Sequence, residues 1–220
     1  MKIKFLVREL FNGKTLSRAL MNYEASVQEK IRGRVLDMGA GNSHSYQRWV
    51  RDIENSERIT VDILPDTHPD ILADLERPFP FKDESFDAVL AFNLLEHIYN
   101  YKNLLSETYR ILKTGGKFIG AVPFLFEVHD APRDFFRYTE YSLSRMLREA
   151  GFENINVKRL GYGPFTAACT LIHLPTIIRL FLVPICILLD KMMPKAHSGS
   201  DKWPLGYFFV AIKRNWGNHV

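Results

Sequence analysis

The sequence predicts an α/β fold in which a mostly parallel, doubly wound sheet carries helices on both faces. Three observations indicate this fold. Short apolar stretches typical of strands alternate with segments of helical periodicity over most of the 220 residues. The stretch Phe86–Asn93 is almost continuously apolar, as expected of a strand covered on both faces. An apolar run beginning at Val35 ends in Asp-x-Gly-x-Gly, which is typical of a strand that leads into a ligand-binding turn.

The order of the predicted elements follows this alternation. Asn42 or Ser43 can cap the helix after the first strand. A later helix is expected to stop at Gly115 and Gly116, because glycine readily adopts the left-handed conformation of a helix C-cap. Strand–helix–strand crossovers of constant hand then place the loops after strands one to five on one edge of the sheet. We expect helices at 15–31, 43–54, 101–112 and 140–150, and strands at 33–38, 57–63, 70–73, 86–93, 117–122, 153–160 and 207–213.

The nine residues Val35–Ser43, VLDMGAGNS, carry the strongest functional signal. Gly39 and Gly41 allow a sharp turn and a close approach of the backbone to a ligand. A dinucleotide fingerprint needs glycine at the sixth position of Gly-x-Gly-x-x-Gly, where this chain has His44. The Asp37 carboxylate would repel a phosphate but would form a charge-assisted hydrogen bond with an ammonium group. The motif therefore favours S-adenosylmethionine as cofactor, and a nicotinamide-dependent oxidoreductase stays an alternative.

With these residues the chain resembles the class I S-adenosylmethionine-dependent methyltransferases, in particular the small single-domain type 11 group. The first motif of that family is Asp/Glu-x-Gly-x-Gly-x-Gly, and Ser43 stands here in place of the third glycine. The run Asp70–Ile98 resembles the family's third and fourth strands, and Thr114 replaces proline in its Leu-Lys-Pro-Gly-Gly ending. These matches span residues 33–153. The resemblance implies a Rossmann-like sheet of seven strands with the last strand antiparallel, and a methyltransferase activity.

The strand ends and the resemblance together assign the cofactor site. Asp62 follows the glycines by about twenty residues, where a carboxylate can accept both hydroxyls of a ribose. Asp74 matches the family's acidic residue that takes the adenine amino group, with the backbone of Leu75 beside the ring. A helix cap or a solvated acid is the alternative for Asp74. Asn93 is expected below the sulfonium. The predicted cofactor residues are Asp37, Gly39, Ala40, Gly41, Asp62, Ile63, Asp74, Leu75 and Asn93, and no metal is expected.

The segment after the fifth strand holds the candidate catalytic residues. Methyl transfer requires an acceptor atom held in line about 3 Å from the methyl carbon, and a hydroxyl acceptor also requires a base. His129 is the candidate base, because the ordinary pKa of histidine suits that role, and Asp130 or Asp134 can orient it. The structural alternative is that Asp134 pairs with Arg137 and only fixes the loop.

The same segment has the form His-x-x-Pro-x-Asp-Phe-x-Arg-Tyr-Thr, which is similar to a run in a subgroup of these enzymes that is often associated with bacterial cell-surface glycan biosynthesis. That resemblance implies a glycan precursor as the acceptor. His97, beside Glu96, is interpreted as a packing residue. Nucleic acid is disfavoured as acceptor, because the chain has no Asn-Pro-Pro-Tyr-like strand end and no aromatic strip beside a basic groove.

Length and a hydrophobic content of 46% suit one domain. We expect an N-terminal helical extension at 1–32, a cofactor-binding core at 33–160, an apolar helical insertion at 161–200, and the last strand and tail at 201–220. Cys169 and Cys186 are interpreted as small buried side chains in a reducing compartment. The first residues lack the long uncharged core of a secretory signal, which favours a cytoplasmic protein.

The net charge of +4 is unevenly distributed. Residues 1–34 and 151–220 each hold eight Lys or Arg and three acidic residues, whereas residues 35–150 hold thirteen basic and nineteen acidic residues. Basic ends of this kind can rest on anionic lipid or on nucleic acid, or can be a solvated surface without a partner.

Residues 164–193 are too apolar for a solvent loop. Pro175, Arg179 and Pro184 leave uncharged pieces shorter than the roughly 20 residues that cross a bilayer. We expect two helices that cover the substrate pocket, lie in a membrane interface at the inner face of the membrane, or form a homodimer interface. The first two arrangements favour an acceptor with an apolar part, such as a lipid-linked sugar or a prenyl-type molecule.

Taken together, these features predict S-adenosylmethionine-dependent methyl transfer to a small-molecule acceptor. A noncatalytic cofactor-binding or membrane-associated partner protein with the same fold is the alternative.

Overall fold

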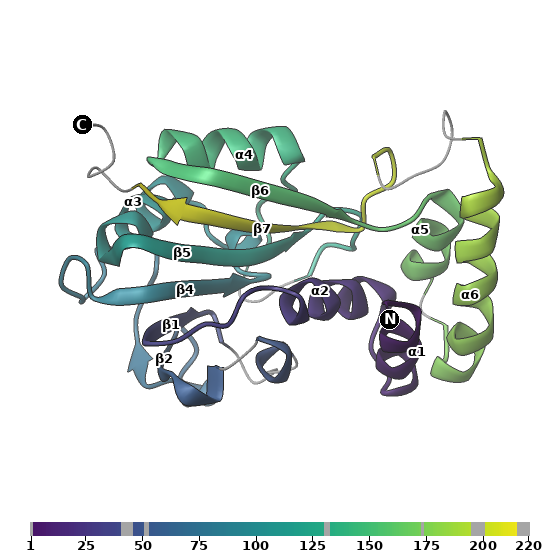
Figure 1. Ribbon diagram of the computed structural model, residues 1–220, viewed down its shortest axis with the longest axis horizontal. Helices are drawn as coiled ribbons and strands as arrows, with labels where there is room; N and C mark the ends of the chain where they lie inside the picture. The colour runs from purple at the N-terminus through teal and green to yellow at the C-terminus, as the bar shows by residue number, and fades with distance from the viewer. Residues whose placement is uncertain are drawn as a thin grey trace.

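The computed structural model describes residues 2–40, 46–50, 53–129, 133–172, 174–194 and 201–214. Its centre is a sheet of seven strands in the order β3-β2-β1-β4-β5-β7-β6 (Figure 1). Strand β7 runs antiparallel to β5 and β6, and the other neighbouring strands are parallel. The predicted α/β sheet with an antiparallel last strand is confirmed. The strands are β1 (Arg34–Met38), β2 (Glu57–Asp62), β3 (Ile71–Leu72), β4 (Phe86–Phe92), β5 (Leu112–Pro123), β6 (Phe152–Leu160) and β7 (Gly206–Lys213).

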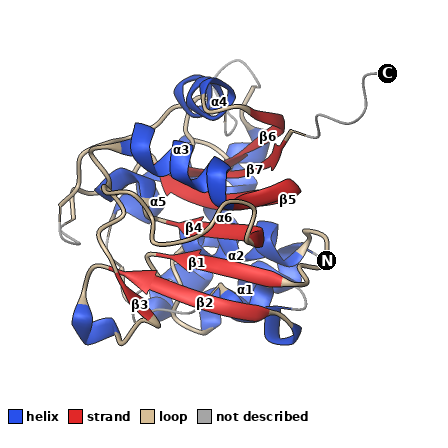
Figure 2. Ribbon diagram, turned by 90° about the vertical axis from the view of Figure 1, so that its left-hand side faces the viewer, coloured by secondary structure: helices blue, strands red, loops and turns tan. Residues whose placement is uncertain are grey.

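Helices cover both faces of the sheet (Figure 2). Side chains of β4 alternate between two apolar cores, so Leu90 and Phe92 face one core while Val89 and Ala91 face the other. The first core packs against α1, α2, α5 and α6, and the second packs against α3 and α4. The helices are α1 (Lys2–Phe11), α2 (Leu16–Ser26), α3 (Tyr101–Ile111), α4 (Glu140–Glu149), α5 (Pro164–Leu171) and α6 (Thr176–Met192).

The helix predictions near the N-terminus need two corrections. The predicted helix at 15–31 is α2, which Thr15 caps and which ends at Ser26. The predicted helical extension at 1–32 also contains α1, whose own bounds were not predicted. The predicted helix at 43–54 is replaced, within the described residues, by the 3₁₀ turns Gln47–Trp49 and Ile53–Asn55. Side-chain contacts made by Tyr46 and Trp49 hold this segment against β1 and α1, and such tertiary contacts override helix propensity. The predicted caps Asn42 and Ser43 lie outside the described residues.

The glycine C-cap predicted for α3 is also wrong. The helix ends at Ile111, and Leu112 is already extended and pairs with Phe86 of β4. The next register pair joins Ala88 to Lys117, so residues 113–116 form a bulge in which Gly115 has a φ of +77°. The glycines therefore serve a strand irregularity rather than the end of the helix.

The apolar insertion forms two helices, α5 and α6, beyond the end of the sheet and beside α1 (Figure 1). Asp190 of α6 caps α5, because its carboxylate accepts hydrogen bonds from the backbone N–H groups of Phe165 (2.9 Å) and Thr166 (3.0 Å). Cys169 and Cys186 are buried as predicted, and burial raises the pKa of both thiols, that of Cys186 to about 11.

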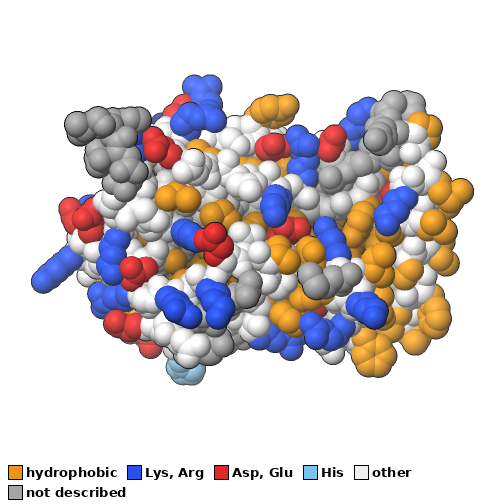
Figure 3. Space-filling view, viewed as in Figure 1, with side chains coloured by type: hydrophobic (Ala, Val, Ile, Leu, Met, Phe, Trp, Pro, Cys, Tyr) orange, Lys and Arg blue, Asp and Glu red, His pale blue; other side chains and the backbone are white. Residues whose placement is uncertain are grey.

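Hydrophobic side chains gather on the surface of α6 (Figure 3). Helix α6 continues through Pro184, one of the residues expected to interrupt the segment. None of the helices in the described ranges has both the length and the apolarity needed to traverse a bilayer.

Candidate functional site

A cavity of about 530 Å³ opens at the carboxyl ends of β1, β2 and β4. This is the edge at which open α/β sheets bind ligands. The cavity brings together six of the predicted cofactor residues. They are Gly39, Asp62, Ile63, Asp74, Leu75 and Asn93.

Two residues in the left-handed conformation shape the floor of this cavity. Gly39 has a φ of +63°, and a Cβ atom there would lie 2.7 Å from Cδ1 of Leu94, so only glycine fits without rearrangement. Asn93, with a φ of +52°, turns the chain at the end of β4. Ala40 is buried and is not among the described lining residues, and Gly41 lies outside the described residues.

Two carboxylates stand at the cavity wall. Asp62 ends β2 and accepts a hydrogen bond of 2.9 Å from the backbone N–H of Leu64. Asp74 accepts a hydrogen bond of 2.9 Å from the N–H of Glu76 and pairs with Arg77. The Asp74 side chain therefore closes a turn over residues 74–77 rather than capping a helix, and the residue lines the cavity.

Asp37 does not share this rim, which corrects the expectation that its carboxylate meets the ligand directly. Its side chain is fully buried and is turned toward the segment after β1. The hydroxyl of Tyr46 donates a 2.7 Å hydrogen bond to it, and Gln47 donates a second of 3.3 Å. Burial raises the pKa of Asp37 to about 6, although the Tyr46 hydrogen bond and Arg58 oppose that shift.

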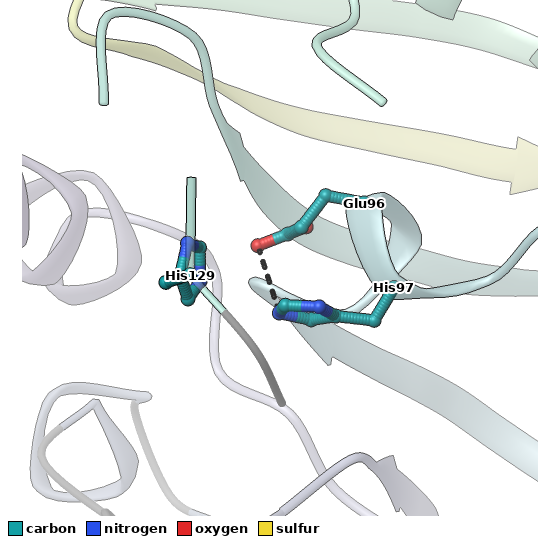
Figure 4. A group of neighbouring side chains, drawn as sticks. All are labelled: Glu96, His97 and His129. Carbon is teal, nitrogen blue, oxygen red and sulfur yellow. Dashed lines mark ion pairs between the residues drawn. The ribbon is translucent and has the colours of Figure 1, made fainter. Parts of the chain in front are cut away.

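Beside the cavity, Glu96, His97 and His129 point toward one another (Figure 4). Glu96 and His97 belong to a 3₁₀ turn directly after β4, and His129 lies on the segment after β5. The Nε2 atom of His97 is 3.8 Å from Oε1 of Glu96. His97 is buried, as its interpretation as a packing residue implies, but it also lines the cavity, which makes it a candidate site residue. The sequence did contain a signal, because the adjacent Glu96 and His97 follow shortly after a buried strand.

The predicted catalytic segment is held by an ion pair. Arg137 donates hydrogen bonds from both terminal nitrogens to Asp134, and this lowers the pKa of Asp134 to about 2. The Nδ1 atom of His129 lies 3.2 Å from the same carboxylate. Asp134 thus contacts the imidazole of His129, which it was expected to orient, and also pairs with Arg137, which fixes the loop. Asp130 lies outside the described residues.

Burial dominates the electrostatics of the cluster. It raises the pKa of Glu96 to about 8 and lowers that of His97. The Glu96 side chain is fully inaccessible, and neither of its oxygens accepts a hydrogen bond from another described residue.

Two further cavities continue from the first in series. One, of about 250 Å³, is lined by His129, Asn93, Lys14 and Arg18, and it shares Asn93 with the cofactor cavity. The other, of about 300 Å³, is walled mainly by α5, α6 and the short link between them. These two smaller cavities share Gly13, Thr15 and Phe126 in their walls. Helices α5 and α6 thus cover a cavity that continues from the one lined by His129.

Comparison with known proteins relates the chain to methyltransferases. Residues 36–120 match the family model of a methyltransferase domain. A Mycolicibacterium smegmatis protein named a probable S-adenosylmethionine-dependent methyltransferase is 32% identical over 80 residues, which cover 34% of this chain and 31% of that protein. The chain spans less than half the length of the curated relatives it matches.

Solved structures share the fold over most of the chain. A SAM-dependent methyltransferase from Archaeoglobus fulgidus superposes with a TM-score of 0.60 at 20% identity, covering 90% of this chain and 93% of that one. Phosphoethanolamine N-methyltransferase 2 of Haemonchus contortus, in complex with S-adenosyl-L-methionine, superposes with a TM-score of 0.57 at 18% identity, covering 88% of this chain and 52% of that one. The class I methyltransferase fold predicted from the sequence is confirmed, and the relatives support S-adenosylmethionine as the type of cofactor.

Proposed function

Because the chain carries a methyltransferase domain of the class I fold, we propose that it binds S-adenosylmethionine and transfers the methyl group to a small molecule with an apolar part. The observation that carries this proposal is the cavity at the strand ends, which gathers Gly39, Asp62 and Asp74 beside a second, polar cavity. The cofactor end and the acceptor end of the site then meet at Asn93, which lines both.

The residues of the larger cavity suit a nucleoside. Asp62 offers a carboxylate that can accept hydrogen bonds from ribose hydroxyls, and Asp74 can accept one from an adenine amino group. Ile63 and Leu75 supply apolar atoms beside these acceptors. Gly39 lets the backbone approach the ligand closely. In this proposal Asp37 acts indirectly, by fixing the segment after β1 through Tyr46.

The chemistry needs positioning more than activation. S-adenosylmethionine supplies a methyl group on a sulfonium, which is already a good leaving group. The chain's own contribution is to hold the acceptor atom in line and to manage its proton if the acceptor is a hydroxyl. His129, oriented by Asp134, lines the acceptor cavity and is placed for that second task.

The cavity under the insertion supports an acceptor with two unlike parts. Lys14 and Arg18 beside His129 suit a polar or anionic head group. The adjoining cavity is walled by Cys169, Leu174 and Val183 among others, which suit an apolar tail. A lipid-linked glycan precursor or a prenyl-type molecule has both parts.

The surface supports delivery of such an acceptor from an anionic membrane. The exposed apolar side chains of α6 recur at helical spacing, and α1, which contacts α6, exposes three more. Lys4 and Arg8 of α1 and Lys191 of α6 are exposed near them and would attract anionic lipid. These features support our proposal that the enzyme works at the inner face of the membrane. The exposed apolar residues are Ile3, Val7 and Phe11 of α1, and Ile177, Ile178, Phe181, Ile185, Leu188, Leu189 and Met192 of α6.

The test is transfer of radiolabelled methyl groups from S-adenosylmethionine to separated aqueous and lipid fractions of a cell extract. We expect label in the lipid fraction with the wild-type protein and a loss of label with His129→Ala. Label confined to the aqueous fraction would contradict the apolar acceptor. Cofactor binding without transfer in any fraction would favour the noncatalytic alternative instead.

A further inference from the structure

We propose that Glu96, His97 and His129 form a binding site for a divalent metal ion of the zinc class. One potential ligand atom from each residue lies within 4.8 Å of the others, and the three side chains converge on one point (Figure 4). Two imidazoles and one carboxylate are a ligand set that Zn²⁺ and related transition metals favour. Tetrahedral zinc holds its ligand atoms roughly 3.3 Å apart, so side-chain shifts of about 1 Å would close the site.

The surroundings of His97 prepare it to bind a metal. Its Nδ1 atom lies 2.6 Å from the backbone carbonyl oxygen of Arg133. A carbonyl oxygen can only accept, so Nδ1 carries the proton and Nε2 presents its lone pair. That Nε2 atom is the one that faces Glu96.

His129 also has its Nδ1 atom beside hydrogen-bond acceptors, one of which is a carboxylate. Its Nδ1 atom lies 3.2 Å from Oδ2 of Asp134 and 3.3 Å from the carbonyl oxygen of Glu127, both of which are acceptors. Nδ1 is therefore the donor, and Nε2 is left as the metal-binding atom. Arg137 holds the Asp134 carboxylate in place. A carboxylate behind a histidine is the outer-shell arrangement that orients metal-binding imidazoles.

Glu96 supplies an independent observation. Its side chain is fully buried, and neither carboxylate oxygen accepts a hydrogen bond from another described residue. A buried carboxylate that no other described residue supplies with a hydrogen bond is costly, and a bound cation would reduce that cost. The side chain extends from its 3₁₀ turn toward the two imidazoles rather than toward solvent (Figure 4).

Three protein ligands leave a fourth position open, as in catalytic rather than structural zinc sites. The cluster lies between the two cavities, because His97 lines the cofactor cavity and His129 lines the acceptor cavity. A metal there would bind the acceptor's hydroxyl oxygen and lower its pKa, so that the proton leaves to water and the oxygen can attack the methyl carbon. This consequence rests on the proposed function, whereas the metal site itself does not. It would make the reaction an O-methylation, with His129 as a ligand rather than as the base.

The site is tested by calorimetric titration of the untagged, chelator-treated protein with Zn²⁺. We expect one ion per chain for the wild-type protein, and at least tenfold weaker binding for His129→Asn and for Glu96→Gln. The control is His68→Asn, which changes an exposed histidine outside the cluster and should bind as the wild-type protein does. Asp134→Asn should weaken binding by about 10- to 100-fold while leaving all three ligands in place.

A second measurement uses only the wild-type protein and therefore does not depend on the folding of any variant. The wild-type protein loaded with Co²⁺ should show the intense visible absorption of a tetrahedral site, and one equivalent of Zn²⁺ should abolish it. Absence of stoichiometric Zn²⁺ binding by the wild-type protein, or equal binding by folded His129→Asn, would overturn the proposal. Binding of S-adenosylmethionine by the metal-free protein is measured separately, so that failure of the metal site is distinguished from failure of the proposed function.

Discussion

The hydroxyl of Tyr46 donates a 2.7 Å hydrogen bond to Oδ1 of Asp37, the acidic residue of the glycine-rich motif. Both side chains are buried, at 2% and 0% exposure. The contact joins the end of β1 to the segment that follows the motif, so the motif's carboxylate shapes the cofactor cavity from behind rather than from its wall.

This buried carboxylate predicts a pH-dependent stability. The pKa of Asp37 is raised to about 6, so the folded protein keeps a proton that the unfolded chain has released. The resulting stabilisation is complete below the unfolded pKa of about 3.8 and is lost as the pH rises through about 6. Asp37→Asn removes the ionisation and keeps an acceptor for Tyr46. Relative to the wild-type protein, the variant should gain about 2 kcal/mol in free energy of unfolding between pH 4 and pH 7.5. Denaturant titrations without ligand measure this, and a difference that does not change with pH would refute the account.

Asp190 is expected to hold the insertion together. Its carboxylate accepts two backbone N–H bonds at the start of α5 and a 2.7 Å bond from the hydroxyl of Thr166. Asp190→Ala leaves these buried donors unsatisfied and should lower the free energy of unfolding by about 2 kcal/mol or more. The neighbouring exposed Lys191→Ala is the matched control and should change stability by less than about 0.5 kcal/mol. Chemical denaturation of both variants measures these changes. If Asp190→Ala is no less stable than Lys191→Ala, Asp190 does not stabilise the start of α5.

The apolar face of α6 is expected to bind anionic vesicles. Phe181 is 70% exposed and Leu188 is 58% exposed, and burying such side chains in lipid contributes about 1.5 to 3 kcal/mol each. Phe181→Ser combined with Leu188→Ser should therefore weaken cosedimentation with phosphatidylglycerol vesicles at least tenfold. Tyr141→Ser on α4, which is 82% exposed, is the control and should leave binding unchanged. If the double variant binds vesicles normally but loses a wild-type dimer, the face is a dimer interface and the membrane proposal is wrong.

The sequence predicted those parts of the fold that depend on local pattern. All seven strands could be recognised from the alternation of strand-like and helical segments, and the two helices of the insertion from their hydrophobicity and length. The sequence predicted a helical extension at 1–32 but defined a helix only at 15–31, so the bounds of α1, which buries Leu6 and Leu10, were not predicted. The end of α3 was misplaced because Gly115 serves a bulge, and only the pairing of β4 with β5 reveals that.

In the candidate site, too, only the features that depend on local pattern could be predicted. Gly39, Asp62 and Asp74 could be placed at the cavity because they follow strand ends, whose positions the topology determines. The surroundings of Asp37 and the approach of His97 to His129 could not be predicted. The side to which the Asp37 side chain turns at the end of β1 depends on its contact with Tyr46. The approach of His97 to His129 depends on a contact between segments that are distant in sequence.

Cofactor binding at the strand ends is tested by calorimetric titration of the folded protein with S-adenosylmethionine and with its demethylated product. We expect binding of one molecule per chain, weakened tenfold or more by Asp62→Ala, because a hydrogen bond to a charged group contributes about 1.5 to 3 kcal/mol. The exposed Asp66→Ala, four residues further along, should bind as the wild-type protein does. Absence of binding heat with either nucleoside, or an unchanged affinity in Asp62→Ala, would contradict the account.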